Sequence, residues 1–465
     1  MSFYPVNLAI FAVANAILLI YRHNRKQKHP SSDGSGTSAD QGRAETQGLL
    51  SAPGELKVAA RQLQLEYYSA YAFAVAADWL QGPHIYAMYK YEKGLPEKHV
   101  AALYASGFIS GAVSASFAGG LSDRFGRRMA CLVYCAAYII TCVSMLSDNV
   151  AVLFLGRLFG GMATTLLFSV FEAWVVTEYH QRNLIRSHLS LGTLFGNAAT
   201  LSSVVAIVSG VVGDFLVARF NGARVWPFVA AAAAAAMAAL LIVAFWPENY
   251  GNRNGDDKVV RSGPTTTPES APSGLRMTLR DKRIWGLGFT STFFEGTMYL
   301  FVFFWSQVLS SARKRAGSDG ELPFGLVFSS FMCAMMAGSN IFSMIVRPHI
   351  RGLTLSLLLT VVLVVSGCLL AVVVLFEDEK WVFWTLCVIE LCIGIYFPSM
   401  SYLKSEVVED GARGRVYSIM RLPLNVFVVV VHSLDQEGDA HRNHVFLTCA
   451  VLLITSFLVL RWSFG

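Results

Sequence analysis

The stretch Gly119-Gly120-Leu121-Ser122-Asp123-Arg124-Phe125-Gly126-Arg127-Arg128 separates two long apolar runs, the first ending at residue 118 and the second beginning at residue 129. Glycine tolerates backbone conformations that other residues avoid, so the glycines let the chain reverse and let helix ends approach closely. Asp123 can cap a helix or pair across the turn, and arginines are biased towards the cytoplasmic face of a membrane. We therefore expect a very tight cytoplasmic turn between two membrane-spanning helices.

The composition extends this expectation to the whole chain. Of its 465 residues, 54% are hydrophobic and only 15% are charged, whereas a soluble domain has about 25% charged residues. A spanning helix needs about 20 apolar residues. Thirteen such runs are present, at residues 4–21, 66–89, 99–120, 129–147, 151–177, 189–213, 226–246, 284–310, 323–346, 352–375, 381–402, 416–432 and 443–462. These features predict an all-α polytopic protein of the lipid bilayer.

Other classes of protein are not indicated. No stretch has the composition of a soluble catalytic domain, so we do not expect an enzyme. The basic residues are scattered over loops and form no nucleic-acid-binding face. The eight cysteines lie in predicted spans, where they are expected to be small core residues and not disulfides or metal ligands. The sequence predicts no metal site and no cofactor.

Polar stretches divide the chain into five parts. Residues 1–22 form an extra N-terminal transmembrane helix, because the basic cluster follows the apolar run instead of preceding it as in a signal peptide. Residues 23–61 are expected to be a disordered cytoplasmic linker. Residues 62–246 and 283–465 form two bundles of six helices, joined by a cytoplasmic linker at 247–282. Most lysines and arginines then fall on the side of the Asp123 turn, with 313–315 as an exception.

Ionisable side chains inside predicted spans are the main candidates for function. Each costs on the order of 3 kcal/mol on insertion scales and normally faces a cavity or a partner. They are Asp78, Arg157, Glu172, Glu295, Glu390 and Arg421. At about 1.5 Å per residue, the acids Asp78, Glu295 and Glu390 fall near mid-membrane, where repeat-built transporters bind substrate. We expect them to line a cavity; a structural hydrogen bond between helices is the alternative.

The remaining candidates have weaker positional arguments. Arg157 lies towards the outer surface and Arg421 towards the inner one, and each either contacts substrate or pairs with an acid. Glu172 is expected to tie its helix to a cytoplasmic turn. Four further polar or aromatic side chains are assigned to the substrate path, with packing as the alternative for the aromatic ones: Gln81, Asn197, Trp305 and Tyr396.

The 119–128 pattern resembles the loop between the second and third helices of the major facilitator superfamily. A closer resemblance, to the molybdate-anion transporter family (the major facilitator domain-containing protein 5 type), extends from about residue 62 to 462. It rests on long blocks, among them Ala76-Ala77-Asp78-Trp79-Leu80-Gln81 and Tyr396-Phe397-Pro398-Ser399-Met400-Ser401.

This resemblance implies the major facilitator fold with an extra N-terminal helix, and uptake of molybdate, a tetrahedral dianion. We expect a monomer in the plasma membrane. The residues assigned to conformational gating are Gly119, Asp123, Arg124, Gly126, Arg127, Arg128 and Glu172.

Charge arithmetic suggests how such a carrier would work. Two intramembrane arginines face four acids, so a fully ionised cavity would repel an anion. Importing two negative charges against about 100 mV, inside negative, costs about 4.6 kcal/mol. Protons entering with the anion would relieve both problems by neutralising Asp78, Glu295 or Glu390, while Arg157 or Arg421 holds the oxyanion. The hypothesis is proton-coupled molybdate import, a symport, by alternating access; the alternatives are a carrier for another small solute and a non-transporting scaffold or receptor.

Overall fold

The computed structural model describes residues 3–28, 53–187, 189–250, 281–317, 322–345, 352–376, 378–408, 413–433 and 438–464. Within these residues the chain is a succession of helices joined by short connections, with no strand. The helices of the amino-terminal half are α1 (Phe3–Lys28), α2 (Pro53–Gln81), α3 (Ile85–Ala87), α4 (Glu97–Ala115), α5 (Ala118–Phe125), α6 (Arg127–Ser144), α7 (Val150–Gln181), α8 (Leu191–Arg219) and α9 (Val225–Phe245). Those of the other half are α11 (Lys282–Arg315), α12 (Phe324–Ile345), α13 (Gly352–Leu375), α14 (Glu379–Val407), α15 (Arg413–Ser433) and α16 (Asp439–Phe464).

The predicted apolar runs are largely helical, although 66–89 and 99–120 each cover more than one helix, and the all-α polytopic fold is confirmed. Ten described helices are long and apolar enough to cross a membrane, and α4 with α5, a pair bent by 52°, would make eleven. Among the remaining long helices, the first half of α2 carries charged residues, and the apolar stretch of α15 found among the described side chains is Pro423–His432. Helix α1 continues to Lys28, and α2 already begins at Pro53, so both ends of the predicted 23–61 linker are helical.

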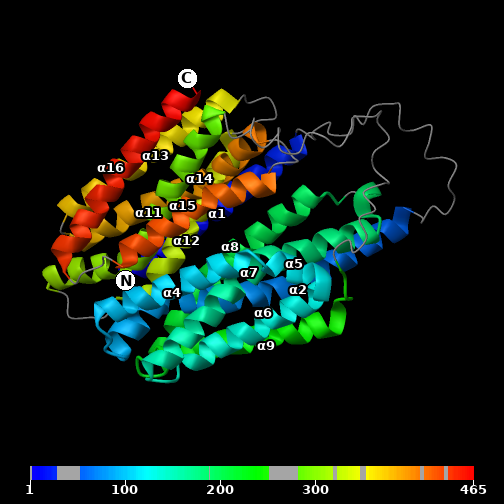
Figure 1. Ribbon diagram of the computed structural model, residues 1–465, viewed down its shortest axis with the longest axis horizontal. Coiled ribbons are helices and arrows are strands. Elements are labelled where there is room, and N and C mark those ends of the chain that lie inside the picture. Colours follow the sequence, from blue (N-terminus) through cyan, green and yellow to red (C-terminus); the bar gives the residue numbers. More distant parts are fainter. Residues whose placement is uncertain are drawn as a thin grey trace.

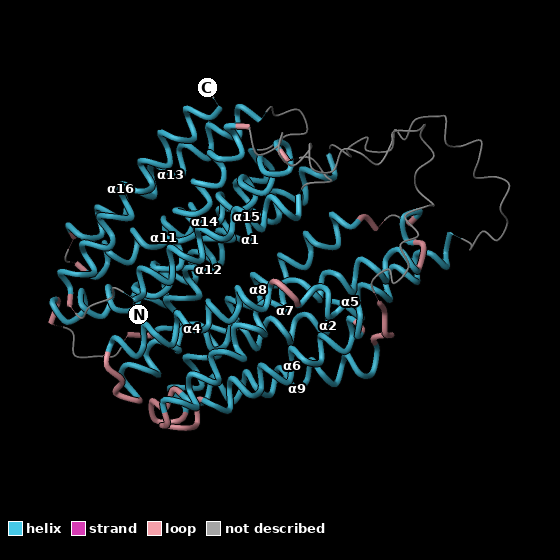
Figure 2. The backbone as a smooth tube through the Cα atoms, in the orientation of Figure 1, coloured by secondary structure: helices cyan, strands magenta, loops and turns pink. Residues whose placement is uncertain are grey.

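The spanning helices form two bundles, α2–α9 and α11–α16, which meet mainly through α8 with α12 and α4 with α15. Figure 1 shows the two bundles meeting at one end and diverging towards the other. The same divergence is visible in the tube drawing of Figure 2, where the short connections cap the ends of the helices. Because α2 and α11 run from the divergent end to the joined end, the divergent end is the inner one in the predicted orientation.

The joined outer end is held by α8 and α12. Gly210 and Gly325 let the two helices approach so closely that a Cβ on Gly325 would lie 2.1 Å from the Gly210 carbonyl oxygen. Asp214 of α8 then accepts hydrogen bonds from the backbone N–H groups of Gly325 and Leu326, both at 2.8 Å, and so caps the first turn of α12. A side chain of one bundle therefore satisfies the helix terminus of the other.

The 119–128 turn differs from the prediction in one respect. Gly119 and Gly120 lie within helix α5, with no atom close to where a Cβ would be, so they do not reverse the chain. The bend falls at Ser116 and Phe117, and the reversal falls at Gly126 alone, whose φ is +109°. A Cβ on Gly126 would lie 2.5 Å from the carboxyl carbon of Glu248, whose oxygens accept from the backbone N–H groups of Arg128 and Met129 in the first turn of α6.

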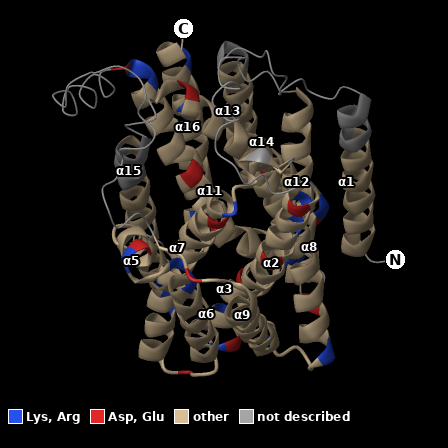
Figure 3. Cartoon of the chain, turned by 90° about the vertical axis from the view of Figure 1, so that its right-hand side faces the viewer, with Lys and Arg blue, Asp and Glu red and all other residues tan. Residues whose placement is uncertain are grey.

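Helix α1 packs at the edge of the carboxyl-terminal bundle beside α12 (Figure 3), and its first residues contact Phe383 of α14. Its Tyr4 hydroxyl donates to Glu379 at 2.5 Å, and Arg313 of α11 pairs with the same carboxylate at 3.0 Å. The cytoplasmic bias of lysine and arginine leaves the outer basic cluster at 313–315 unexplained. The ion pair between Arg313 and Glu379 gives a reason for it, because an acid neutralises at least one charge of the cluster.

Candidate functional site

A polar cluster lies inside the amino-terminal bundle, at the outer end of α2. The Asp78 carboxylate accepts a hydrogen bond from the Tyr138 hydroxyl of α6 at 2.9 Å. The Gln81 amide, one turn along α2, donates to the same hydroxyl, and its own carbonyl oxygen is buried. Tyr138 therefore links the two predicted residues, and a single aromatic hydroxyl orients the carboxylate.

Arg157 of α7 completes this cluster. Its guanidinium lies 5.5 Å from the centre of the Tyr104 ring and donates to the Leu103 carbonyl oxygen at 3.4 Å. Gly107 faces it so closely that a Cβ there would be 3.0 Å from the guanidinium. No direct ion pair joins Arg157 and Asp78 among the described side chains; the guanidinium lies within the range of a longer electrostatic interaction with that carboxylate. The structure thus brings Asp78, Gln81 and Arg157 together.

A second cluster lies in the carboxyl-terminal bundle, between α11 and α14. One oxygen of Glu295 accepts from the Ser291 hydroxyl at 2.6 Å and from the Tyr396 hydroxyl at 3.2 Å. The ammonium group of Lys404 lies 3.7 Å from that oxygen and 3.0 Å from the Ser291 hydroxyl. The ring of Tyr396 is fixed by stacking on Phe294, at 3.8 Å between ring centres. Glu295 and Tyr396 were predicted; Ser291 and Lys404 were not.

Glu390 does not join either cluster. It follows Phe383 by seven residues, about two turns of α14, and therefore lies on the same side of the helix. Phe383 contacts the rings of Phe3 and Tyr4 on α1, and Glu390 interacts with Cys387 in the same region. Glu390 itself is buried, with 5% of its surface exposed, and within the described residues no hydrogen bond or ion pair joins it to either cluster.

The other predicted substrate residues are separated from the clusters. Trp305 is buried against the rings of Phe324 and Phe331 within its own bundle. Asn197 is exposed near the inner end of α8. Arg421 lies on α15, but its side chain lies outside the described residues.

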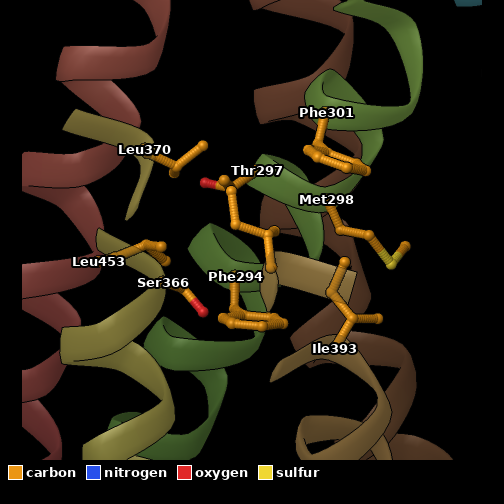
Figure 4. Close-up of a pocket in the computed structure, with 9 residues that line it drawn as sticks. Phe294, Thr297, Met298, Phe301, Ser366, Leu370, Ile393 and Leu453 are labelled. Atoms are coloured by element: carbon orange, nitrogen blue, oxygen red, sulfur yellow. The ribbon is translucent and has the colours of Figure 1, made fainter. Parts of the chain in front are cut away.

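A small cavity of about 10 Å³ lies among the described residues of the carboxyl-terminal bundle, and Figure 4 shows its lining. Apolar side chains such as Phe294 and Leu453 line it, and the hydroxyls of Thr297 and Ser366 are its polar groups. A space of this size holds about one water molecule. It is too small for an oxyanion, so the clusters above remain the candidate site.

Known proteins that are similar to this chain indicate the class of protein in which these clusters occur. A family model described as sugar transporters with 12 transmembrane segments matches residues 54–380. The molybdate-anion transporter of Xenopus tropicalis is 30% identical over 407 residues, covering 86% of this chain and 85% of the relative. That of Danio rerio is 30% identical over 433 residues, covering 86% of each.

The chain belongs to the molybdate-anion transporter family of the major facilitator superfamily. It is therefore a multi-pass membrane transporter and not an enzyme. The fold recurs in solved structures of low identity. A mutant of the nucleoside transporter NupG aligns with a TM-score of 0.66 and 13% identity, over 87% of this chain and 100% of that chain. An auto-inhibited POT family peptide transporter also gives 0.66, with 12% identity, over 87% and 96%.

In this family member, the predicted gating turn is tied to its own bundle. Asp123 pairs with Arg127 at 2.8 Å, and Arg127 also donates to the Ala173 carbonyl oxygen of α7 at 3.1 Å. Arg128 donates to the Val243 carbonyl oxygen of α9 at 2.9 Å. Arg124 is exposed and lies over the ring of its neighbour Phe125.

Glu172 is not the acid that holds this region together. It is exposed and makes no hydrogen bond or ion pair within the described part of the chain. Glu178, almost two turns further along α7, instead pairs with Arg182 at 3.1 Å and accepts from Asn249 at 3.0 Å. Sequence reasoning favoured Glu172 because it lies within an apolar run, whereas Glu178 is the residue that faces the packed interior.

Proposed function

We propose that this transporter carries molybdate, or a closely related tetrahedral oxyanion, into the cell together with protons. The observation that carries the proposal is a pair of clusters, each on the first and fourth spanning helices of its bundle. Asp78 and Arg157 lie on α2 and α7; Glu295 and Lys404 lie on α11 and α14. Each cluster combines a carboxylate, which can accept a proton, with a cation and hydroxyl donors suited to an oxyanion. The molybdate-anion transporters among the relatives support this substrate class.

The energetics favour coupling to protons. A dianion moving inwards against about 100 mV costs about 4.6 kcal/mol, and each proton moving with it offsets about 2.3 kcal/mol. Protonation of Asp78 or Glu295 would also remove a negative charge from the path of the anion. The two clusters thus supply the cations that would bind the anion and the carboxylates that would accept a proton.

The arrangement of the bundles supports alternating access. The polar contacts between the bundles lie at the outer end, where Gln307 donates to Glu97 at 2.9 Å and Asp214 caps α12. The inner ends diverge in Figure 1. We infer a conformation closed to the outside, which opens outwards when these contacts separate. Because one chain supplies both clusters, we also propose a monomeric carrier, placed in the plasma membrane where import begins.

Uptake of labelled molybdate into proteoliposomes tests the substrate class. Wild-type protein should accumulate molybdate under an inward proton gradient, and unlabelled tungstate should compete where organic cations do not. Replacing Arg157 by Gln should lower uptake about tenfold or more, as expected for a lost charge-assisted contact. The matched control is Arg219→Gln, which removes an exposed arginine at the outer end of α8.

Two results would overturn the proposal. Competition by organic cations without competition by oxyanions would indicate a carrier of a different solute class. No uptake of any solute in the panel, with the protein correctly folded, would indicate a scaffold or receptor.

A further inference from the structure

Lys404 is a cation that lies just beyond the apolar run predicted to span the membrane. The predicted run ends at residue 402, but α14 continues to Val407. The Lys404 side chain reaches back to Ser291 and Glu295 of α11, at 3.0 Å and 3.7 Å. The side chains of Lys404 and Glu295 are 18% and 17% exposed, so both are partly accessible and partly shielded.

The donors around Glu295 converge on a single oxygen. The Ser291 and Tyr396 hydroxyls donate to it, and the Lys404 ammonium lies beside it. An ammonium group and two hydroxyls are also the donors that an oxyanion needs. The Glu295 carboxylate therefore uses the same kinds of donor that a substrate oxyanion would need.

We propose that Lys404, Ser291 and Tyr396 form an oxyanion-binding station, and that ionised Glu295 fills it until a proton binds Glu295. This inference rests on the proposed oxyanion import and adds the exchange by which proton and anion are coupled. One proton joins the Glu295 carboxylate and gives a neutral acid, which no longer competes for the ammonium group. The oxyanion then takes the three donors. When the proton leaves on the inner side, the carboxylate takes the donors back and displaces the anion.

The surroundings of Glu295 support this assignment. From α14 the titratable groups that face it are Lys404 and Tyr396. Helix α15 presents Met420, Leu424 and Phe427 to α11, all apolar. Helix α16 presents Ser463 at Gly286 and Cys449 near Thr297. Among the described side chains on these helices, Lys404 is therefore the cation that can exchange Glu295 for a substrate anion.

Kinetics of molybdate uptake into proteoliposomes test the station. In Lys404→Gln the KM for molybdate should rise about tenfold or more, because an ammonium contact to the anion is lost. In Lys404→Arg, which keeps the charge, the KM should stay close to that of the wild type. Lys282→Gln removes a lysine from the same membrane face, at the exposed start of α11, and should leave the KM unchanged.

The variant Glu295→Gln tests whether molybdate replaces the Glu295 carboxylate at the three donors or only responds to the net charge of the site. With no carboxylate to displace, this variant should bind molybdate equally well in acidic and in neutral medium, and acidification should no longer lower its KM. The double variant Glu295→Gln with Lys404→Gln should bind molybdate as weakly as Lys404→Gln alone. Thermal unfolding of each purified variant confirms that it is folded.

Failure of the station and failure of the proposed function give different results. If the wild type imports molybdate but Lys404→Gln keeps a normal KM, the station is wrong and oxyanion import stands. The station is equally wrong if Glu295→Gln keeps the pH dependence of the wild type, even where Lys404→Gln cannot be purified. If the folded wild type takes up no oxyanion at all, the proposed function and this inference both fall.

Discussion

At the scale of single residues, the hydrogen bond between Tyr138 and Asp78 gives a test of the proposed part of Asp78 in proton coupling. Tyr138→Phe leaves the Asp78 carboxylate without this donor and the buried Gln81 amide without its acceptor. We expect a loss of about 1–3 kcal/mol of stability. Acid-driven uptake should also extend to more alkaline external medium, because the lost hydrogen bond stabilised the ionised carboxylate.

Tyr134→Phe is the matched control for this prediction. Tyr134 lies one turn earlier on α6, and its hydroxyl donates at 2.8 Å to a backbone carbonyl oxygen, that of Ala74. Both variants should unfold at lower temperature in detergent, but only Tyr138→Phe should change the pH dependence of molybdate uptake. An unchanged pH profile in Tyr138→Phe would mean that Asp78 takes no part in coupling.

The residue scale also shows how far the sequence alone could lead. Asp78, Arg157 and Glu295 were found because a charge is conspicuous in an apolar run. Glu390 is equally conspicuous and is buried, but no hydrogen bond or ion pair joins it to either cluster within the described residues, and no local pattern reveals this. Lys404 was missed for the opposite reason, because it lies after the apolar run and its long side chain contacts Ser291 and Glu295 on another helix, α11.

At the scale of elements, the reversal between α5 and α6 depends on one glycine. Gly126 has a positive φ, and a side chain there would meet the Glu248 carboxyl group. We expect Gly126→Ala to cost about 1–3 kcal/mol, the usual cost of a backbone conformation that other residues avoid. Gly120→Ala, inside α5 and open on all sides, should instead be neutral or gain up to about 1 kcal/mol. Thermal unfolding midpoints would decide, and equal destabilisation by both substitutions would contradict this description of the turn.

The turn is shorter than predicted because helix α5 occupies most of the stretch that was expected to be a loop. Residues 119–125 contain two glycines, a serine and two charges, a composition typical of a loop. They nevertheless continue as helix α5 after the bend at Phe117. Ser122 is buried, and its hydroxyl bonds the Gly119 carbonyl oxygen within the helix. The position of a bend within a continuous span depends on such packing and not on composition.

At the scale of the whole molecule, we expect Asp214 to hold the outer end closed. Its carboxylate accepts hydrogen bonds from two backbone N–H groups of the opposite bundle. Asp214→Ala removes hydrogen bonds to a charged group worth about 1.5–3 kcal/mol each. We expect the outward-open population to rise about tenfold or more.

A cysteine reporter measures this population. Ser329 of α12 is fully buried, and its hydroxyl bonds the Ile207 carbonyl oxygen of α8 across the interface at 2.8 Å. A cysteine at this position should react faster with an impermeant thiol reagent from outside once Asp214 is replaced. Asp378→Ala is the control, because Asp378 caps α14 within a single bundle. Equal labelling rates in the two backgrounds would show that Asp214 does not hold the outer end closed.

The overall architecture was the part most accessible from sequence. Apolar length alone locates the spanning helices, and the resemblance to the superfamily implies their grouping into two bundles. The cross-bundle cap at Asp214 was not foreseen, because the residue lies at the end of its apolar run and its partners are backbone groups more than 100 positions away.

Proton movement during molybdate entry tests the central claim most directly. Proteoliposomes containing the protein and an internal pH indicator would be given external molybdate without an imposed pH gradient. The two-cluster mechanism predicts internal acidification on adding molybdate, abolished by a protonophore and absent in liposomes that carry Glu295→Gln. Molybdate entry at the wild-type rate with no change in internal pH would contradict it.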